Sequence, residues 1–432
     1  MTFLLLKTLP RALATACVVW AGASAIAPAT AQELAPVLPP TDTVVQVLAQ
    51  LPQVRAASAG IPLAQARSQR LQAGPHDWVA KVATNRRSDT QGGRFSETEI
   101  GLETGMRWPA KVKADQRLGS AEVSVGRGIH ADAWHEAARS LLTDWFDALR
   151  DARNTALLQE QAQLATRQLA TTQRRVQAGE AAPLELLAAQ AEEARIQALA
   201  ARARAQAHLR QQTLQHQYPG LPDPAGALSA AATPWPDQDA ADLPVAHWAQ
   251  LILADNHELE LAQARAEQAQ LQAQRAQLEQ RGDPTLGVRA TRERSGQEKV
   301  WGVYVSIPLG GAGRKADFEA ALAQAEVALQ EQEQVRQRVE IQAWRTASEA
   351  EQARTTRQQM QRALARIQQS AALQARAYEL GESPLADLLL ARRNALEAQL
   401  AADTASLDAM QAHAKVLLDA HRLWSIPGTA GH

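Results

Sequence analysis

The chain has 432 residues and a formal net charge of −1, so it is long enough for one large or two ordinary domains and lacks the excess charge of a polyanion-binding protein. Apolar residues make up 46% of the chain but aromatic residues only 4%, a poor supply for an ordinary globular core. The interior is rich in Ala, Gln, Glu, Arg and Leu, a composition typical of long helices or coiled coils.

Residues 1–31 predict a secretory signal peptide that is cut before Gln32. Lys7 and Arg11 precede an apolar run over residues 12–27, and Ala29-Thr30-Ala31 is a small-x-small cleavage sequence. An uncleaved membrane anchor is the alternative interpretation, but the run is short and is interrupted by small residues.

The single cysteine, Cys17, lies inside this segment, so the mature chain is predicted to hold no disulfide and no thiolate metal site. Lipidation of Cys17 is the alternative, but the apolar run continues past it to Ala27. No later run approaches about 20 apolar residues, so the sequence predicts no membrane-spanning helix. An exported protein without one can still enter an outer membrane as a β-barrel.

A first group of elements is predicted over residues 32–217, after a Pro-rich lead-in. A helix is expected from about Thr43 to Ala73, and two strands follow. In the second strand, apolar residues such as Ile100 and Leu102 alternate with charged residues and glycine, which indicates one apolar and one polar face. The predicted strands cover about 77–87 and 94–108.

A very long helix is predicted from Lys113 to Ala178, with glycines weakening its first part, and a returning helix from Leu184 to about Gln217. Some 60 helical residues span roughly 90 Å, so this helix has to pack along other helices. Gly179 and Pro183 predict the turn between the two helices, because Gly closes a helix in the left-handed conformation and Pro suits the first turn of the next.

The same order is predicted again over residues 245–432, after an irregular segment at 218–244 that is rich in Pro, Asp and Ala. The expected elements are a helix over 245–280, strands at about 284–293 and 299–308, a long helix over 315–380, the turn at Gly381 and Pro384, and a returning helix over 385–423.

Matching residues of the two groups are separated by nearly constant distances along the sequence. The offset is 202 between the turn glycines (381 − 179), 201 between the turn prolines (384 − 183), 202 for Lys113 and Lys315, and 199 for Pro109 and Pro308. Trp145 and Trp344 are also 199 apart. The sequence therefore predicts an internal duplication of about 200 residues.

Two strands per half give four strands per chain, too few to close a barrel around a pore. An open sheet with a lipid-facing side leaves unpaired edges in hydrocarbon. Several chains are therefore expected to share one barrel, and three chains with four strands each give twelve, an even number within the range of outer-membrane barrels.

At this point the sequence resembles the outer-membrane factor (TolC) family of efflux-pump exit ducts, over essentially the whole mature chain. The doubled Gly-x-x-(x)-Pro-Leu-acid-Leu-Leu turn and the doubled strand pair carry the resemblance. Asn256-His257-Glu258-Leu259 is similar to the family's Asn-Pro-x-Leu helix start with His257 in place of Pro, and Leu51-Pro52-Gln53-Val54 is its counterpart in the first half.

The resemblance implies a mainly α fold with a small β part: a homotrimer whose long helical hairpins form a periplasmic α-barrel beneath a shared twelve-stranded outer-membrane β-barrel. It implies no cofactor. The implied partners are a periplasmic adaptor (membrane fusion) protein, an inner-membrane pump of the RND type and outer-membrane lipid. By the same resemblance the turns between the long helices lie at the periplasmic tip and dock the adaptor, through Gly179, Pro183, Leu184, Gly381, Pro384 and Leu385.

Acidic residues just after the turns line the entrance of such ducts, and Glu185 and Asp387 occupy that position here. In a trimer each is expected to form a ring of three carboxylates, whose members repel one another and attract cations. A further acid of the family, one turn later, is replaced by Leu390. The alternative role of Glu185 and Asp387 is to compensate a helix dipole.

The remaining candidates have structural alternatives. Trp78, Trp108, Trp301 and Tyr304 are expected to form an aromatic girdle at the membrane interface, or else to fill a core. His130 and His135 are five apart, off the helical ligand spacing, and are expected to be surface residues. Arg392-Arg393 is expected to lie on a solvated helix face.

Two other protein classes compete with the duct. A periplasmic adaptor has one helical hairpin flanked by β-rich halves, whereas here the hairpin is doubled and each copy follows a strand pair. A soluble coiled-coil scaffold leaves the strand pairs unexplained. No catalytic set stands out, so the sequence does not favour an enzyme. The second turn, Gly381-Glu382-Ser383-Pro384-Leu385, looks like branches of the family that export heavy-metal cations.

Overall fold

The computed structural model describes residues 37–88, 90, 92–230 and 244–426. The predicted signal peptide, Cys17 and half of the predicted irregular segment lie outside the described residues.

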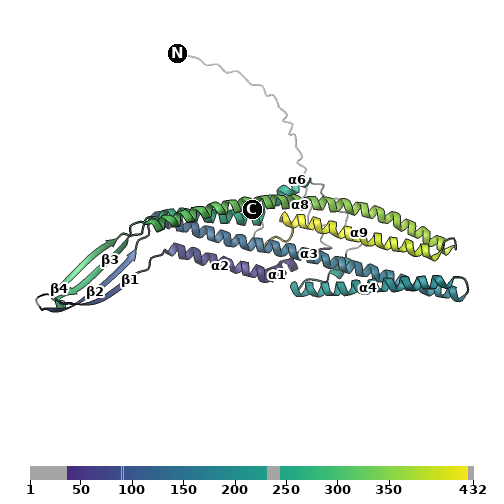
Figure 1. Ribbon diagram of the computed structural model, residues 1–432, viewed down its shortest axis with the longest axis horizontal. Coiled ribbons are helices and arrows are strands. Elements are labelled where there is room, and N and C mark those ends of the chain that lie inside the picture. The colour runs from purple at the N-terminus through teal and green to yellow at the C-terminus, as the bar shows by residue number, and fades with distance from the viewer. Residues whose placement is uncertain (1–36, 89, 91, 231–243, 427–432) are drawn as a thin grey trace, which may run out of the picture.

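The molecule is elongated, with a β-sheet at one end, long helices along its length, and two helix–helix turns at the far end (Figure 1). The first half comprises α1 (Thr41–Gln50), α2 (Pro52–Ala73), β1 (Val79–Ser88), β2 (Arg94–Gly105), α3 (Pro109–Gln177) and α4 (Pro183–Gln217). After the short α5 (Pro224–Ala230), the second half comprises α6 (Val245–Ala254), α7 (His257–Glu279), β3 (Thr285–Glu293), β4 (Glu298–Ser306), α8 (Ala312–Glu379) and α9 (Leu385–Asp419).

This order confirms the predicted fold of each half, and the structure adds two helix breaks. The first predicted helix is divided at Leu51, where Pro52 begins α2. The corresponding helix of the second half is divided at Asn256, whose side chain accepts a hydrogen bond from the Leu259 backbone N–H at 2.9 Å. Asn256 thus caps α7, because it satisfies one of the N–H groups that a helix start leaves unpaired.

The glycines in the first part of α3 were expected to weaken that helix, but α3 is continuous over 69 residues. A Cβ at Gly119 would lie 3.2 Å from the Ser68 Cα, and one at Gly128 would lie 3.4 Å from the Leu261 Cβ. The glycines therefore serve close packing of α3 against α2 and α7, and the helix tolerates their lower propensity because of this packing.

The four strands form one antiparallel sheet in the order β1-β2-β3-β4. Each half contributes a hairpin, and the two hairpins join through β2 and β3, with Gly101 opposite Arg289 and Leu102 opposite Val288. Strands β1 and β4 are the edges of the sheet within the chain.

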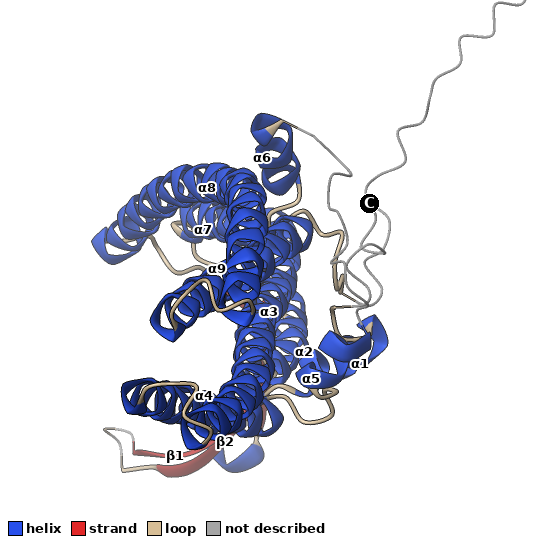
Figure 2. Cartoon of the chain, turned by 90° about the vertical axis from the view of Figure 1, so that its right-hand side faces the viewer, coloured by secondary structure: helices blue, strands red, loops and turns tan. Residues whose placement is uncertain are grey.

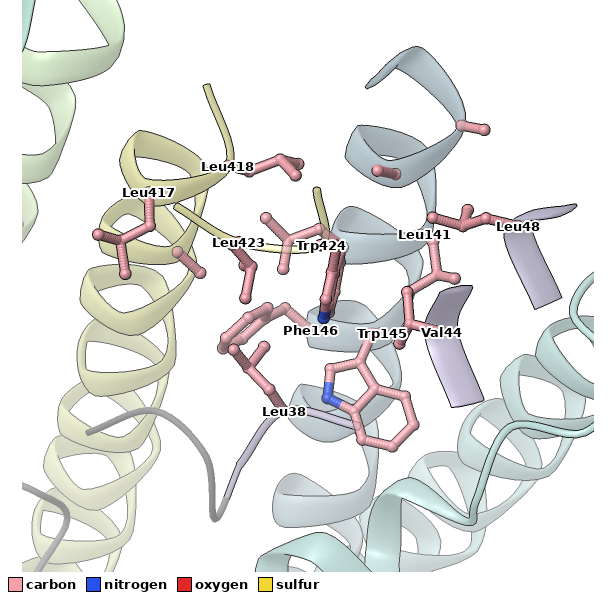
Figure 3. Packing of buried hydrophobic residues seen from close by; sticks show 14 of the residues in the cluster. Leu38, Val44, Leu48, Leu141, Trp145, Phe146, Leu417, Leu418, Leu423 and Trp424 are labelled. Atoms are coloured by element: carbon pink, nitrogen blue, oxygen red, sulfur yellow. The ribbon is translucent and has the colours of Figure 1, made fainter. Parts of the chain in front are cut away.

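The main apolar core lies midway along the helices, where both ends of the described chain meet α3 (Figure 3). Trp145 and Phe146 are fully buried there, packed among residues of α1, the C-terminal end of α9 and the segment after it. The Trp145 Nε1 donates to the Val37 carbonyl at 2.9 Å, and the Trp134 Nε1 donates to the Trp424 carbonyl at 3.1 Å.

Viewed along their length, the helices form a curved layer rather than a closed bundle (Figure 2). Helix α3 packs on α2 and α4 of its own half and on α7 and α9 of the other half. We call this contact between the halves the inter-repeat interface. Helix α8 lies along one edge of the layer, and α1, α2 and α4 lie along the other (Figure 1).

Candidate functional site

The turns at the end farthest from the sheet have the same backbone geometry. Gly179 and Gly381 both have φ of +77°, the left-handed region that favours glycine. At the first turn Glu180 N–H donates to the Arg175 carbonyl at 2.8 Å, and at the second Glu382 N–H donates to the Ala377 carbonyl at 2.9 Å. This is the Schellman arrangement, which satisfies helix-end carbonyls with N–H groups just beyond the helix. The sequence prediction of two equivalent turns is confirmed.

The two turns differ in the side chains that they present. After the first turn Pro183 begins α4, and Leu184 is 75% exposed; after the second, Pro384 precedes α9, and Leu385 is buried in a small cluster with Leu388 and Leu389. An exposed leucine at a helix start is available to a partner, whereas a buried one holds its own hairpin together.

The two predicted entrance acids also lie in different surroundings. Asp387 is exposed and lines a groove of about 700 Å³ between α8 and α9, together with Asn394 and Glu397. Glu185 is partly buried in the first turn of α4. Within the single chain the two carboxylates belong to separate hairpins.

Several contacts near the turns tie the two hairpins together, and the sequence did not reveal them. Arg175 of α3 donates to the Tyr378 hydroxyl of α8 at 2.7 Å. Arg393 of α9 donates to the Glu192 carboxylate of α4 at 2.6 Å, and Arg195 pairs with the same carboxylate at 2.8 Å. Burial by itself would raise the pKa of Glu192, but the hydrogen bonds from both arginines outweigh it and lower that pKa.

The expectation that Arg392-Arg393 lies on a solvated helix face holds in part, because Arg393 is 44% exposed, but both side chains also bond the other hairpin. Besides the Arg393–Glu192 pair, Arg392 donates to the Gln168 side chain of α3 at 3.1 Å. Both arginines join hairpins whose sequences are about 200 residues apart, so no local spacing could have identified them.

At the other end of the molecule, the sheet has one apolar and one polar face. The apolar face is solvent-exposed in the single chain and carries Ala80, Val82, Ile100, Leu102, Leu286, Val288, Ala290, Trp301, Val303 and Val305. On the opposite face Lys81 pairs with Glu103 at 2.6 Å, and the Tyr304 hydroxyl also donates to Glu103. An exposed apolar patch of this size marks contact with lipid or another apolar surface.

The predicted aromatic girdle is divided between the faces. Trp301 is 82% exposed on the apolar face, and Trp78, just before β1, is 70% exposed. Trp108 follows β2 and donates from its Nε1 to the Gly282 carbonyl at 3.0 Å. Tyr304 lies on the polar face beside Glu103, the face opposite to that of Trp301.

A buried ion network joins the sheet to the helices. Arg107 contacts Asp115 at 2.7 Å, Glu279 at 2.6 Å and Asp283 at 3.0 Å. Lys111, almost fully buried, contacts Glu279 and Asp283 at 2.8 Å each. Burial by itself would raise the pKa of Asp283, but hydrogen bonds led by that from Lys111 lower it to about 2. These contacts fix the sheet to both halves of the helical layer.

No helix in the described part of the chain is long and apolar enough to cross a membrane.

No protein-family model matches the sequence, and the comparison with curated proteins found no match. Solved structures do match. The outer membrane protein VceC of Vibrio cholerae is 16% identical, with a TM-score of 0.68 over 88% of this chain and 95% of that one. The CmeC outer membrane channel of Campylobacter jejuni is 13% identical, with a TM-score of 0.72 over 89% and 86%. The MtrE outer membrane channel of Neisseria gonorrhoeae is 15% identical, with a TM-score of 0.65 over 89% of each chain.

The chain has the outer-membrane channel fold. The agreement spans 88–89% of this chain, and it confirms the fold class that the duplicated pattern of helices and strands predicted.

One feature in this outer-membrane channel fold was missed by the sequence prediction. His135 of α3, His257 at the start of α7 and His421 after α9 converge at the inter-repeat interface. The rings of His257 and His421 stack at 4.2 Å between centroids, and His135 contacts Asp419 at 3.3 Å. The expectation of a surface His135 is wrong, because its side chain is only 13% exposed.

The surroundings of the histidines lower the pKa of both an acidic group, Asp419, and a basic group, His421. Asp419 accepts from Arg139 at 2.8 and 2.5 Å, and these bonds together with that from His135 outweigh burial and lower the Asp419 pKa to about 2. Burial, followed by electrostatic interaction with the neighbouring His257 and His135, lowers the pKa of His421 to about 4. Among the described residues, no three His, Cys, Asp or Glu side chains are arranged to hold a metal ion.

Proposed function

We propose that this protein is the outer-membrane exit duct of a tripartite efflux or secretion system, and that it acts as a homotrimer. The observation that carries the proposal is the combination, in an outer-membrane channel fold, of an exposed apolar sheet face at one end and two long hairpins at the other. The sheet has two free edges, β1 and β4, and copies that pair these edges close a barrel without leaving backbone groups unpaired in lipid.

In the proposed assembly the hairpins of all copies form a tunnel that extends into the periplasm. The turns at Gly179 and Gly381 then form its periplasmic tip, and an adaptor docks against them. Leu184 and Leu187 are exposed in the first two turns of α4, beside the turn at Gly179, and supply apolar contact area. The adaptor and the RND-type pump are proposed from the family resemblance of the whole mature chain. The heavy-metal cation class of substrate is proposed from the resemblance of the second turn alone.

Fractionation tests the location and the oligomeric state together. The full chain, expressed with its own N-terminal segment, is expected in the outer membrane as an SDS-resistant trimer that dissociates on boiling. A monomer released with the soluble periplasmic fraction would overturn the proposal, and would favour a periplasmic adaptor or scaffold instead.

The gate is tested by electrical recording. We propose that Asp387 lines the entrance, since its carboxylate is exposed in the groove between α8 and α9. Asp387→Asn is expected to lower cation preference or change single-channel conductance in planar bilayers, because it removes a ring of negative charge. Glu340→Gln, an exposed change in the middle of α8, is the matched control. If both variants conduct like the parent protein, Asp387 only compensates the α9 dipole.

A further inference from the structure

The exposed apolar face of the sheet becomes basic toward the tip, the end formed by the two hairpin turns (Figure 1). In the register of the four strands, the last apolar row across this face consists of Val82, Ile100, Ala290 and Trp301. Beyond that row, the strand residues of the same face are only Ser, Thr, Arg and Lys. The basic ones, which we call the basic rim, are Arg86, Arg94, Arg292 and Lys299.

The basic rim is separated from the acidic residues of the sheet. On the opposite face Lys81 pairs with Glu103 at 2.6 Å and Arg87 with Glu97 at 3.5 Å. The same face holds every carboxylate of the four strands, at Glu97, Glu99, Glu103, Glu293 and Glu298. The side chains of the basic rim are exposed and form no ion pair with any residue that the structure describes. Positive charge on the apolar face is therefore unbalanced within the sheet.

The residues of the basic rim also lie beside one another as like charges. Arg292 of β3 is the direct cross-strand partner of Lys299 of β4. Arg86 of β1 lies opposite Ser96, so Arg94 is its diagonal neighbour two residues along β2. Directly opposite side chains on one face have Cβ atoms about 4.5–5.5 Å apart, and like charges at that separation destabilise a sheet. An anion that bridges Arg292 and Lys299 would remove this repulsion.

The basic rim begins where the apolar band ends. From Trp301 to Leu309 every second residue is apolar and exposed, and this stretch of nine residues fits the 9–11 residues with which a tilted strand crosses hydrocarbon. Trp301 ends the band, and tryptophan favours the boundary between hydrocarbon and headgroups. Lys299 lies two residues farther toward the tip, roughly 7 Å along the strand. This places the basic rim at the depth of lipid headgroups.

We propose that the basic rim binds the phosphate groups of anionic lipid headgroups, with one phosphate held between Arg292 and Lys299. The inference rests on the proposed outer-membrane duct, in which the helices extend into the periplasm and the tip of the sheet faces the outer leaflet. A guanidinium group can bind two phosphate oxygens at once, and three of the four residues of the basic rim are arginines. Thr98 lies in the same row as Arg292, and its hydroxyl offers a further donor.

Native mass spectrometry of the purified trimer tests the lipid preference. The probes are phosphatidylglycerol, which is anionic, and phosphatidylcholine, which has a phosphate but no net charge, each added in dodecyl maltoside. The parent trimer is expected to bind phosphatidylglycerol more tightly. Arg292→Gln/Lys299→Gln should weaken that binding about 25-fold, since each basic residue near an anionic surface contributes about a factor of five. Binding of phosphatidylcholine should not change.

The matched control is Arg87→Gln/Arg289→Gln, which removes the same charge from the opposite face of the sheet. It should bind phosphatidylglycerol like the parent. Equal affinity of the parent trimer for both lipids, or an equal loss in the control, would overturn the inference but not the proposed function. Displacement of phosphatidylglycerol by the same concentration of inorganic phosphate would also overturn it, because the basic rim would then bind free anions. A protein that forms no trimer and retains neither lipid would count against the proposed function.

The like-charge pair provides a second readout, which a lysine that is only solvated would not change. Without anionic lipid, Lys299→Gln should raise the temperature at which the trimer dissociates on native gels, because it removes the repulsion with Arg292. On addition of phosphatidylglycerol, the parent should gain more thermal stability than this variant. Lys299→Arg keeps the charge and should behave like the parent under both conditions. An equal gain from phosphatidylglycerol in Lys299→Gln and the parent would overturn the phosphate contact of Arg292 and Lys299.

Discussion

The histidines at the inter-repeat interface are the clearest positions at which the two halves of the sequence differ. The two histidines of the second half have no histidine at the equivalent positions of the first half, where Pro52 matches His257 and Pro219 matches His421. His421 also has φ of +54°, a left-handed conformation that ends α9 and that costs a non-glycine residue about 1–2 kcal/mol. The site therefore combines a strained backbone at His421 with a lowered pKa of the same ring.

A pH dependence of stability follows from the lowered pKa of His421. The folded chain keeps this ring neutral down to about pH 4, whereas the unfolded chain takes up a proton near the ordinary value of 6.5. Stability is therefore fully present above pH 6.5 and is lost as the pH falls from 6.5 towards 4. Hydrogen exchange of residues 417–426 should show this loss, and His421→Asn, which tolerates a left-handed backbone, should flatten the profile.

The matched control is His208→Asn, a change at an exposed histidine on α4. It should retain the pH dependence of the parent protein. Equal slopes for the parent and the His421→Asn variant between pH 6.5 and 4 would contradict the assignment of this effect to His421.

Among the secondary-structure elements, the glycines of the long helices show what sequence rules can and cannot predict. The tip turns could be located because Gly179 and Gly381 sit at helix ends, where a left-handed residue has a local cause. The glycines inside α3 could not be interpreted locally, because their role depends on α2 and α7 packing beside them. The same holds for His135 and Arg393, whose partners come from the other half of the chain.

Two glycine substitutions distinguish the effect of close packing on stability from the effect of helix propensity. Gly60 lies in α2, and a Cβ there meets nothing within 4 Å, so Gly60→Ala should raise the free energy of unfolding by about 0.5–1 kcal/mol. At Gly119 the Cβ would lie 2.5 Å from the Ser68 Oγ and 3.2 Å from the Ser68 Cα. Gly119→Ala should therefore lower stability, by about 1–3 kcal/mol before the propensity gain. Thermal denaturation of the two variants should give shifts of opposite sign.

Across the whole molecule, the two faces of the sheet are the feature that the sequence predicted best. Alternation of apolar with charged residues is a local property of the sequence. It predicted both faces of the sheet and all four strands. The pairing of strands between the two halves is a tertiary property. The sequence did not predict the β2–β3 contact, which the structure shows.

A lysine scan of the sheet tests which face meets lipid. Val303 is exposed on the apolar face of β4, whereas Thr291 of β3 lies on the opposite face. Val303→Lys should destabilise the membrane-inserted form by up to about 2–4 kcal/mol, because a charge then sits in hydrocarbon. Thr291→Lys should be tolerated. Folding yields of both variants in lipid vesicles measure the difference, and equal yields would argue that the apolar face is covered by protein instead.

The inter-repeat interface also has a kinetic consequence. Because a single polypeptide carries both of its faces, α3 meets α7 at the high effective concentration of a tethered pair, and this contact forms without any encounter between chains. In the proposed trimer, by contrast, pairing of the sheet edges β1 and β4 requires a second molecule. Dilution of the newly exported chain would thus slow the pairing of edges between copies, whereas every waiting monomer would already have formed its contact between α3 and α7.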